Sequence, residues 1–136
     1  MPAKSPEEIC SLFQQYMSEG DIDGVLSVYD SEAVILDKSG KVKKGEEGLR
    51  QNLAPFAAAK ARFDFTINQV IQTGDIALMH TKWNVSGPHT MTVHAIEVAR
   101  RQPNGTWRWL IGDPFTIGRL ESGKAVSVTG GESNGS

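Results

Sequence analysis

The first part of the chain repeats apolar residues with the period of an α-helix. Ser5-Pro6-Glu7-Glu8 is a typical helix start, in which Ser5 can cap the helix and Pro6 suits its first position. The apolar residues that follow are spaced to share one helical face: Ile9, Leu12, Phe13, Tyr16 and Met17. Gly20 is expected to end this helix, and Asp21 to cap a second one. The apolar face of this second helix consists of Ile22, Val25, Leu26 and Tyr29.

A short apolar run and a third helix are expected next. Residues 33–36 predict a strand, residues 37–40 have the composition of a turn, and Val42 can belong to a returning strand. The third helix is expected from about Glu46 to Ala54. Pro55 has no amide hydrogen to donate, so a break or kink is expected there, with one more short turn over residues 56–60.

The period then changes to two, which is typical of half-buried strands. Phe63, Phe65 and Ile67 alternate with polar residues, and further strands are expected over residues 76–86 and 90–101. Pro103-Asn104-Gly105 predicts a hairpin turn into a strand from Thr106 to about Ile117. Trp107, Trp109 and Ile111 are expected on one face of that strand.

Helices followed by long antiparallel strands predict an α+β fold. We expect N-terminal helices packed in the concave face of a curved, mostly antiparallel sheet, which forms a cone-shaped barrel. Residues 1–120 are expected to be this single domain, and residues 121–136 a flexible tail rich in glycine and serine.

Composition and charge narrow the classes of partner. The formal net charge is -2, whereas nucleic-acid-binding proteins usually carry a basic surplus, so no nucleic acid is expected. The single cysteine excludes an intrachain disulfide. No apolar stretch approaches the ~20 residues that a membrane helix needs, and the N-terminus does not resemble a signal peptide. A cytoplasmic protein without membrane contact is therefore expected.

Several motifs in order resemble the nuclear-transport-factor-2-like superfamily. The run from Gly20-Asp21 to Ala33-Val34 is similar to its opening, and the later matches are Gly45-Glu46-Glu47-Gly48-Leu49, Gly74-Asp75-Ile76-Ala77-Leu78 and Asn104-Gly105-Thr106-Trp107-Arg108-Trp109. Together the motifs cover roughly residues 6 to 117, and they most resemble the SnoaL-like and ketosteroid-isomerase-like branch. Isomerases, cyclases, dehydratases and oligomerisation domains all use this fold, so the resemblance concerns structure more than activity.

The resemblance implies candidate catalytic residues. Asp37 matches the position of the general base in ketosteroid-isomerase-like enzymes, and Tyr29 that of a supporting tyrosine. Phe13 stands near the expected hydrogen-bond donor tyrosine, with Tyr16 one turn on, and His94 stands near the expected protonated aspartate. Because both donors differ, chemistry other than steroid isomerisation is implied.

Each candidate also has a structural interpretation. Asp37 either caps the turn that it begins or projects into a cavity. His94 shares a face with Thr92 and Ile96, which we expect to point into the cone, although a buried, hydrogen-bonded histidine is the alternative. Asp113 is either a second pocket acid or a turn residue before Pro114.

Two further features complete the candidate site. Trp83 and Trp109 either fill the core or line a pocket for a flat, apolar ligand. His89 and His94 lack the spacing of metal ligands, so neither a metal nor any other cofactor is expected.

Two classes of function remain. The first is a cofactor-free isomerase, cyclase or lyase that abstracts a proton from a small, mostly apolar carbonyl compound, with Asp37 as base and His94 as oxygen partner. The second is a non-catalytic module that binds a small ligand or dimerises. In either case a homodimer is expected, by resemblance and because the open face of the sheet alternates apolar residues.

Overall fold

A computed structural model describes residues 2–87 and 89–121 of the chain. The elements follow in the order α1 (Pro6–Glu19), α2 (Ile22–Ser27), β1 (Tyr29–Leu36), β2 (Val42–Lys44), α3 (Gly45–Ala58), β3 (Arg62–Thr73), β4 (Ile76–Ser86), β5 (Met91–Arg101), β6 (Trp107–Asp113) and α4 (Thr116–Glu121). The strands form one sheet in the order β2-β1-β6-β5-β4-β3. All neighbouring pairs are antiparallel except β1 with β6, which is parallel.

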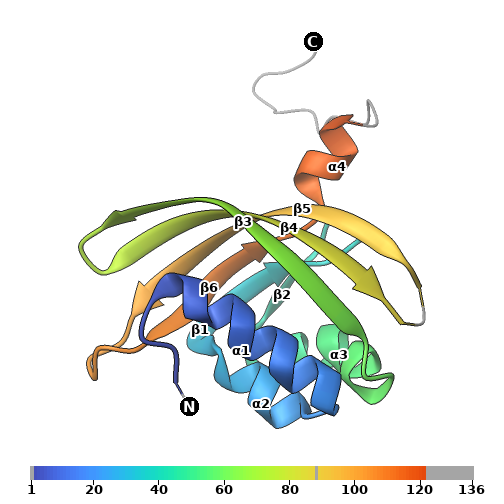
Figure 1. Ribbon diagram of the computed structural model, residues 1–136, viewed down its shortest axis with the longest axis horizontal. Helices are drawn as coiled ribbons and strands as arrows, with labels where there is room; N and C mark the ends of the chain where they lie inside the picture. Colours follow the sequence, from blue (N-terminus) through green and yellow to red (C-terminus); the bar gives the residue numbers. More distant parts are fainter. Residues whose placement is uncertain (1, 88, 122–136) are drawn as a thin grey trace.

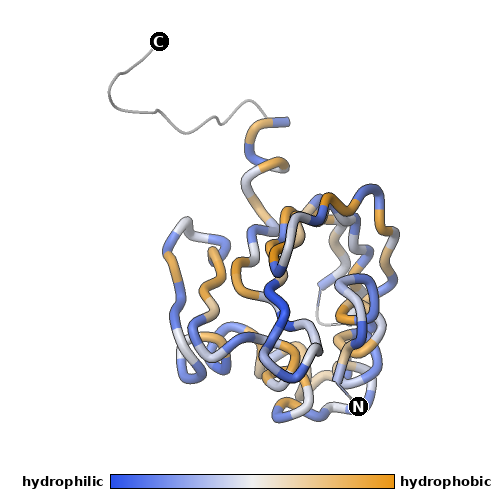
Figure 2. Tube along the Cα trace, turned by 90° about the vertical axis from the view of Figure 1, so that its left-hand side faces the viewer, coloured by the Kyte–Doolittle hydropathy of each residue, from blue (hydrophilic) through white to orange (hydrophobic). Residues whose placement is uncertain are grey.

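The sheet curves over α1, α2 and α3, which cover its concave side, whereas α4 projects beyond the opposite side (Figure 1). Hydrophobic and hydrophilic residues alternate along the strands (Figure 2). This architecture confirms the expected α+β fold, with a curved and open sheet. Of the expected tail, only Glu121 is described, at the end of α4, and the other residues lie outside the described part of the chain.

The first helix forms as its sequence predicts. The Ser5 hydroxyl accepts a hydrogen bond from the Glu8 amide at 3.3 Å, and Gly20 ends the helix with φ of 72°, in the left-handed region that favours glycine. Ile9, Cys10, Phe13 and Met17 are all buried against the concave face of the sheet. Helix α1 is therefore the main filling of the cone.

The helical spacing of apolar residues had placed Tyr29 in the second helix, but in the structure Tyr29 belongs to a strand. Helix α2 ends at Ser27, and β1 begins at Tyr29. Tyr29 is paired with Trp109, and the Trp109 amide donates to the Val28 carbonyl at 2.8 Å. Pairing with β6 thus overrides the local helical pattern.

The expected break at Pro55 is wrong, because α3 continues through this residue to Ala58. A proline inside a helix leaves the carbonyl four residues earlier without its usual donor. That residue is Gln51, which is exposed, so water can satisfy its carbonyl.

The last strand is shorter than expected and changes face within its length. It ends at Asp113, and Pro114 lacks the amide hydrogen that a further ladder bond would need. The register shifts between Val98 and Ala99, so that Ala99 pairs with Trp109 and Val98 with Ile111. Trp109 therefore stays buried whereas Ile111 is 43% exposed, which corrects the expectation that they share a face.

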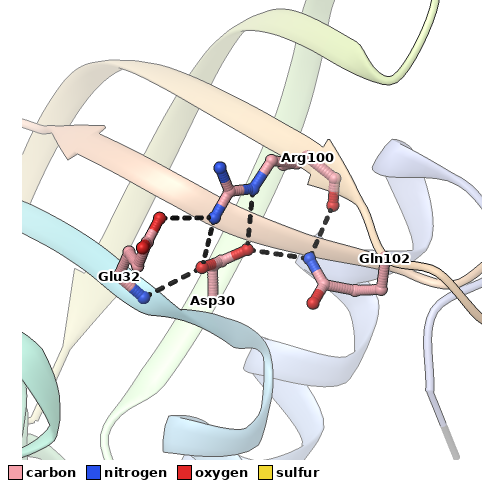
Figure 3. A network of polar contacts seen from close by, with 4 residues as sticks. All are labelled: Asp30, Glu32, Arg100 and Gln102. Carbon is pink, nitrogen blue, oxygen red and sulfur yellow. Dashed lines mark hydrogen bonds and ion pairs between the residues drawn. The ribbon is translucent and has the colours of Figure 1, made fainter.

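A polar network ties β1 to β5 across the intervening β6 (Figure 3). Arg100 donates two hydrogen bonds to the Asp30 carboxylate, at 3.0 Å from Nε and 2.8 Å from Nη2. Gln102 donates a third at 2.8 Å, and the Glu32 amide a fourth at 2.9 Å. The Asp30 side chain is only 3% exposed, so these donors replace the water that it lost on folding.

The network also determines the charge state of Asp30. Burial alone would raise the pKa of Asp30, but the hydrogen bonds from Arg100, from the Glu32 amide and from Gln102 outweigh it. Together they lower the pKa to about 2. Because the folded pKa lies below the ordinary value of 3.8, the network stabilises the fold at neutral pH, and this stabilisation is lost as the pH falls towards 2.

We expect Asp30→Asn to lower the free energy of unfolding at pH 7 by about 2 kcal/mol, which corresponds to the shift in pKa. The variant should also lose less stability than the wild type between about pH 4 and pH 2. Chemical denaturation followed by tryptophan fluorescence measures both effects.

Glu32→Gln is the matched control, because Glu32 binds the same Arg100 but its side chain is 74% exposed. It should cost less than about 1 kcal/mol, as exposed ion pairs do. Equal losses in the two variants would contradict the role given to burial of Asp30.

Candidate functional site

The concave side of the sheet contains a cavity of about 90 Å³ between α1, α3 and the strands. Its lining is mainly apolar and aromatic: Phe13, Tyr29, Ile35, Asn52, Leu53, Phe56, Phe63, Trp83, Val85, Met91, Val93, Ala95, Glu97, Trp109, Gly112, Asp113, Pro114 and Phe115. Glu97 is buried, whereas Met91, Pro114 and Phe115 are only partly so. The cavity therefore runs from a buried acid towards a mouth near the start of β5.

Glu97 is held at the cavity wall by two donors from β4. The Thr81 hydroxyl donates to Oε1 at 3.0 Å, and the Trp83 indole nitrogen donates to Oε2 at 3.2 Å. The same indole nitrogen lies 2.9 Å from the Thr81 hydroxyl oxygen. All three side chains are buried, so the carboxyl group has a fixed orientation.

Burial determines how Glu97 titrates. Loss of solvation raises the pKa of this carboxyl from 4.5 to about 7, although the hydrogen bonds from Thr81 and Trp83 oppose the rise. A carboxyl group in this range exchanges protons at neutral pH, which is the property that general acid–base catalysis requires.

Two other ionisable groups lie close enough to feel the charge on Glu97. Burial, together with that charge, raises the pKa of Tyr29 and the pKa of Cys10. Cys10 is therefore an unreactive thiol, and Tyr29 keeps its proton. No hydrogen bond of the Tyr29 hydroxyl is found among the described residues, and the Tyr29 side chain lines both the cavity and a second cleft with Asp23 and Leu26.

Asp37 lies in the turn after β1, where it makes the contacts of a turn residue. Its Oδ1 accepts hydrogen bonds from the Ser39 amide at 2.9 Å, the Ser39 hydroxyl at 2.6 Å and the Lys41 amide at 2.9 Å. These bonds lower the pKa of Asp37. Asp37 is absent from the cavity lining, so its catalytic role stays a prediction that this position does not support.

His94 points away from the cavity, contrary to the expected orientation. Met91, Val93, Ala95 and Glu97 of β5 line the cavity, and alternation along the strand places His94 on the other face. His94 pairs with Lys82 there and is only partly buried. Asp37 and His94 are therefore not brought together at one site.

Most of the residues predicted to support or line the pocket do lie at the cavity. Phe13, Tyr29, Trp83, Trp109 and Asp113 all line the cavity. Tyr16 instead lines a separate cleft with Leu12 and Trp107. Asp113 also has its turn role, because its Oδ1 accepts from the amides of Phe115 and Thr116 at 3.3 and 3.1 Å.

Glu97 is the residue that our interpretation of the sequence missed. It has the same parity as Ala95 and Ala99, whereas Arg100 and His94 have the other parity. A lone acid among small apolar residues on one face of a strand indicates a buried carboxyl group, and this signal was present in the sequence.

The described residues contain neither a cluster of metal ligands nor a helix that could span a membrane. No group of three or more His, Cys, Asp or Glu side chains in this part of the chain could hold a metal ion. None of its helices is long and apolar enough to cross a membrane.

We expect Glu97→Gln to become progressively more stable than the wild type as the pH rises. The folded protein binds the Glu97 proton more tightly than the unfolded chain does, so the wild type loses stability from about pH 4.5 to about pH 7. The glutamine variant lacks this loss, and the difference should reach about 3 kcal/mol. Urea denaturation at a series of pH values measures it.

Glu47→Gln, at an exposed position of α3, is the control and should show no such trend. A difference between Glu97→Gln and the wild type that does not change with pH would show that Glu97 titrates normally.

Comparisons with known proteins concern the fold and the family of the chain. Among solved structures, the chain is similar to a protein of unknown function with a cystatin-like fold from Nostoc punctiforme, with a TM-score of 0.66, 19% identity and coverage of 79% of this chain and 85% of that one. A ketosteroid isomerase-like protein from Erwinia carotovora atroseptica has a TM-score of 0.59 at 17% identity, over 79% of this chain and 89% of that one. At these identities the likeness concerns the fold alone.

A third similar structure is a nuclear transport factor 2-like protein of unknown function from Silicibacter pomeroyi. It has a TM-score of 0.60 and 17% identity, and the match covers 79% of this chain and 88% of that one. No curated protein sequence matches the chain. The family model for the SnoaL-like domain matches residues 11–128, which is most of the chain. The chain therefore belongs to the SnoaL-like family.

Proposed function

We propose that the cavity binds a small, mostly apolar carbonyl compound and that Glu97 moves a proton at the carbon beside the carbonyl group. The observation that carries this proposal is a buried carboxyl group, held by Thr81 and Trp83, with a pKa of about 7 at the wall of a mainly apolar cavity. Apolar walls with a few fixed polar groups are typical of small-molecule sites. A pKa near the working pH gives both forms of the acid at once.

The proposed step uses the residues of the cavity alone. The ionised Glu97 takes a proton from the carbon, and the electron pair of that bond moves to the carbonyl oxygen to give an enolate. The Tyr29 hydroxyl donates a hydrogen bond to this oxygen, where the negative charge develops. Glu97 then returns the proton at the same or another carbon, or the enolate expels a leaving group. Isomerase, cyclase and lyase activities share this step.

Position favours Glu97 over Asp37 as the base. The Asp37 carboxylate accepts three hydrogen bonds from residues of its own turn, and it does not line the cavity. A base must come within hydrogen-bond reach of the proton that it removes. Tyr29 likewise takes the place proposed for His94 as the oxygen partner, because it lines the cavity and His94 does not.

The alternative function is a non-catalytic site that binds a small ligand. The volume restricts the ligand of either function to a small compound, because about 90 Å³ is less than the ~150 Å³ of a cavity that holds benzene. Phe13 occupies much of the cone, with ring centroids 5.1 to 5.4 Å from Phe63, Trp83 and Trp109. Small carbonyl compounds are therefore the right probes for both functions. The expected cytoplasmic location stays a prediction.

We expect the protein to accelerate exchange of the methyl hydrogens of acetone, a carbonyl compound small enough for a cavity of about 90 Å³, in D₂O, measured by proton NMR. Glu97→Gln should slow the enzyme-dependent exchange about 100-fold or more, as loss of a general base does. Tyr29→Phe should slow it less, because one hydrogen bond is lost. The wild-type rate should rise with pH and level off above about pH 7, when Glu97 is ionised.

Asp37→Asn is the decisive comparison, and it should keep the wild-type exchange rate. Loss of exchange in Asp37→Asn but not in Glu97→Gln would return the role of base to Asp37. Binding of acetone without any exchange would support the non-catalytic alternative.

We further propose that the outer face of the sheet forms a homodimer. A row of apolar side chains crosses this face through paired positions on neighbouring strands: Ile71, Leu78, Val98, Ile111 and Val34. Ile71 is 51% and Ile111 43% exposed. A contiguous apolar row of this kind favours contact with another protein surface, and a twofold dimer is the commonest solution.

We expect sedimentation to show a dimer at micromolar concentration, and Ile111→Glu to shift it to a monomer by burying a charge at the interface. Gln51→Glu is the control, since Gln51 is exposed on α3, which covers the concave side of the sheet, and the variant should stay dimeric. A monomeric wild-type protein would contradict this proposal.

A further inference from the structure

We infer that the ligand is a neutral aliphatic carbonyl compound of about the size of acetone, and that the Trp109 indole nitrogen donates a hydrogen bond to its oxygen. This inference rests on the proposed function, which it extends to a substrate class and a further binding residue. Three features of the cavity carry it: the unpaired donor of Trp109, the open space at Gly112, and the combination of a small volume with an absence of cations among the described lining residues.

Trp109 is a buried donor that lacks an acceptor. Its side chain is only 3% exposed, and its Nε1 makes no hydrogen bond within the described part of the chain. Rings surround the indole, with centroids of Phe13 at 5.4 Å, Tyr29 at 5.5 Å and Trp83 at 6.1 Å. Buried polar groups in folded proteins are nearly always hydrogen-bonded. Because Trp109 lines the cavity, an oxygen atom inside the cavity can accept this hydrogen bond.

Trp109 and Glu97 face this cavity from neighbouring strands. Ala99 pairs with Trp109 across β5 and β6, and Glu97 lies two residues from Ala99 on the same face of β5. Diagonal neighbours of this kind are roughly 7–8 Å apart. A compound whose oxygen and reacting carbon are both bonded to one carbonyl carbon can therefore reach both side chains. A carbonyl oxygen has two lone pairs, so Trp109 can donate to it beside Tyr29.

Gly112 leaves open the space beside the Glu97 carboxyl group. It pairs directly with Glu97, is buried and lines the cavity. The nearest neighbours of a methyl group added there would be side-chain atoms of Ile35, at 3.5 to 4.0 Å, which is ordinary contact. Close packing therefore does not require glycine at this position. Its effect is to keep part of the cavity empty next to the proposed base.

Volume and charge restrict what can occupy this space. In proportion to benzene, whose six carbon atoms fit a cavity of ~150 Å³, a cavity of about 90 Å³ holds roughly four non-hydrogen atoms. Among the described residues that line it, Glu97 and Asp113 are acids and none is a lysine, arginine or histidine. A carboxylate ligand would therefore be desolvated beside like charges without a counterion. A neutral carbonyl compound such as acetone avoids this cost.

The test is a titration of the ¹⁵N-labelled wild-type protein with acetone at pH 7, followed through the assigned indole N–H signals in two-dimensional NMR spectra. The chain has three tryptophans, and Trp107 does not line the cavity. Acetone should move the Trp109 signal downfield, because its N–H gains an acceptor, and should leave the Trp107 signal in place. A Trp109 signal that acetone does not move would overturn the inference.

Acetate and cyclohexanone test the substrate class in the same titration. Acetate has the shape of acetone but carries a negative charge, and cyclohexanone is neutral but larger. Each should bind about ten-fold or more weakly than acetone. Equal affinity for acetate would reject the restriction to neutral compounds, and equal affinity for cyclohexanone would reject the restriction on size.

Gly112→Ala should weaken acetone binding about ten-fold or more, because the new methyl group takes up space beside Glu97. Gly118→Ala is the matched control, since Gly118 lies on α4 and a methyl group there meets no atom within 4 Å. It should keep the wild-type affinity. An affinity that Gly112→Ala does not change would overturn the placement of the ligand beside Glu97.

Trp109→Phe should also weaken acetone binding, whereas Trp107→Phe, the same change on the same strand outside the cavity, should not. If Trp109→Phe does not fold, the shift of the wild-type Trp109 signal and the effect of Gly112→Ala still decide the inference. Equal affinities of the two tryptophan variants would reject the role of Trp109.

These results are distinguishable from those of the proposed function. A shift of the Trp109 signal without hydrogen exchange in acetone would leave the ligand class standing and reject proton transfer. Hydrogen exchange that Trp109→Phe leaves unchanged would support proton transfer with Tyr29 as the oxygen partner and reject the role of Trp109.

Discussion

The packing of α1 into the concave face of the sheet is the constraint on which the rest of the structure depends. A sheet that curves this strongly encloses more space than its own side chains fill. Phe13 supplies the missing volume by meeting rings from β3, β4 and β6 at once. Aromatic contacts of this kind contribute about 0.5–1.5 kcal/mol each beyond the area that they bury. The filling stops short of Glu97, and what remains is the cavity.

The same packing explains the chemistry of Glu97. A carboxyl group on a solvated sheet would ionise near its ordinary pKa of 4.5, but the helix and the aromatic walls exclude water and raise the pKa to about 7. The hydrogen bonds from Thr81 and Trp83 compensate only in part for the water that the carboxylate loses on burial. The raised pKa of Glu97 thus has two consequences. It lowers the free energy of unfolding at neutral pH, and it allows the carboxyl group to exchange protons there. Asp30 shows the opposite case, in which fixed donors outweigh burial and hold the charge.

Much of the fold could be predicted from the sequence, because α1 and the strands β3 to β5 carry a clear period. What failed depended on contacts between distant segments. Tyr29 joins a strand because β6 pairs with it. Pro55 is a local exception, since Gln51, whose carbonyl the proline leaves without a donor, is exposed to water. The shift of register beside Val98 moves Ile111 to the outer face, and no local pattern encodes this shift. Such features come from tertiary pairing, which outweighs local preference.

The candidate site was harder to predict than the fold, since position along a family pattern does not determine which way a strand faces. His94 and Glu97 are three residues apart on β5, and alternation therefore sends them to opposite faces. An error of one residue in the alignment of a strand exchanges a cavity residue for a surface residue. Asp37 illustrates a second difficulty. Strand β1 contributes Ile35 to the cavity lining, but the strand ends at Leu36, so Asp37 lies in the following turn outside the cavity. The number of apolar residues that share a face of the strand with an acid thus predicts its burial better than family position does. By that measure Glu97 is the acid on β5 that the fold isolates from water.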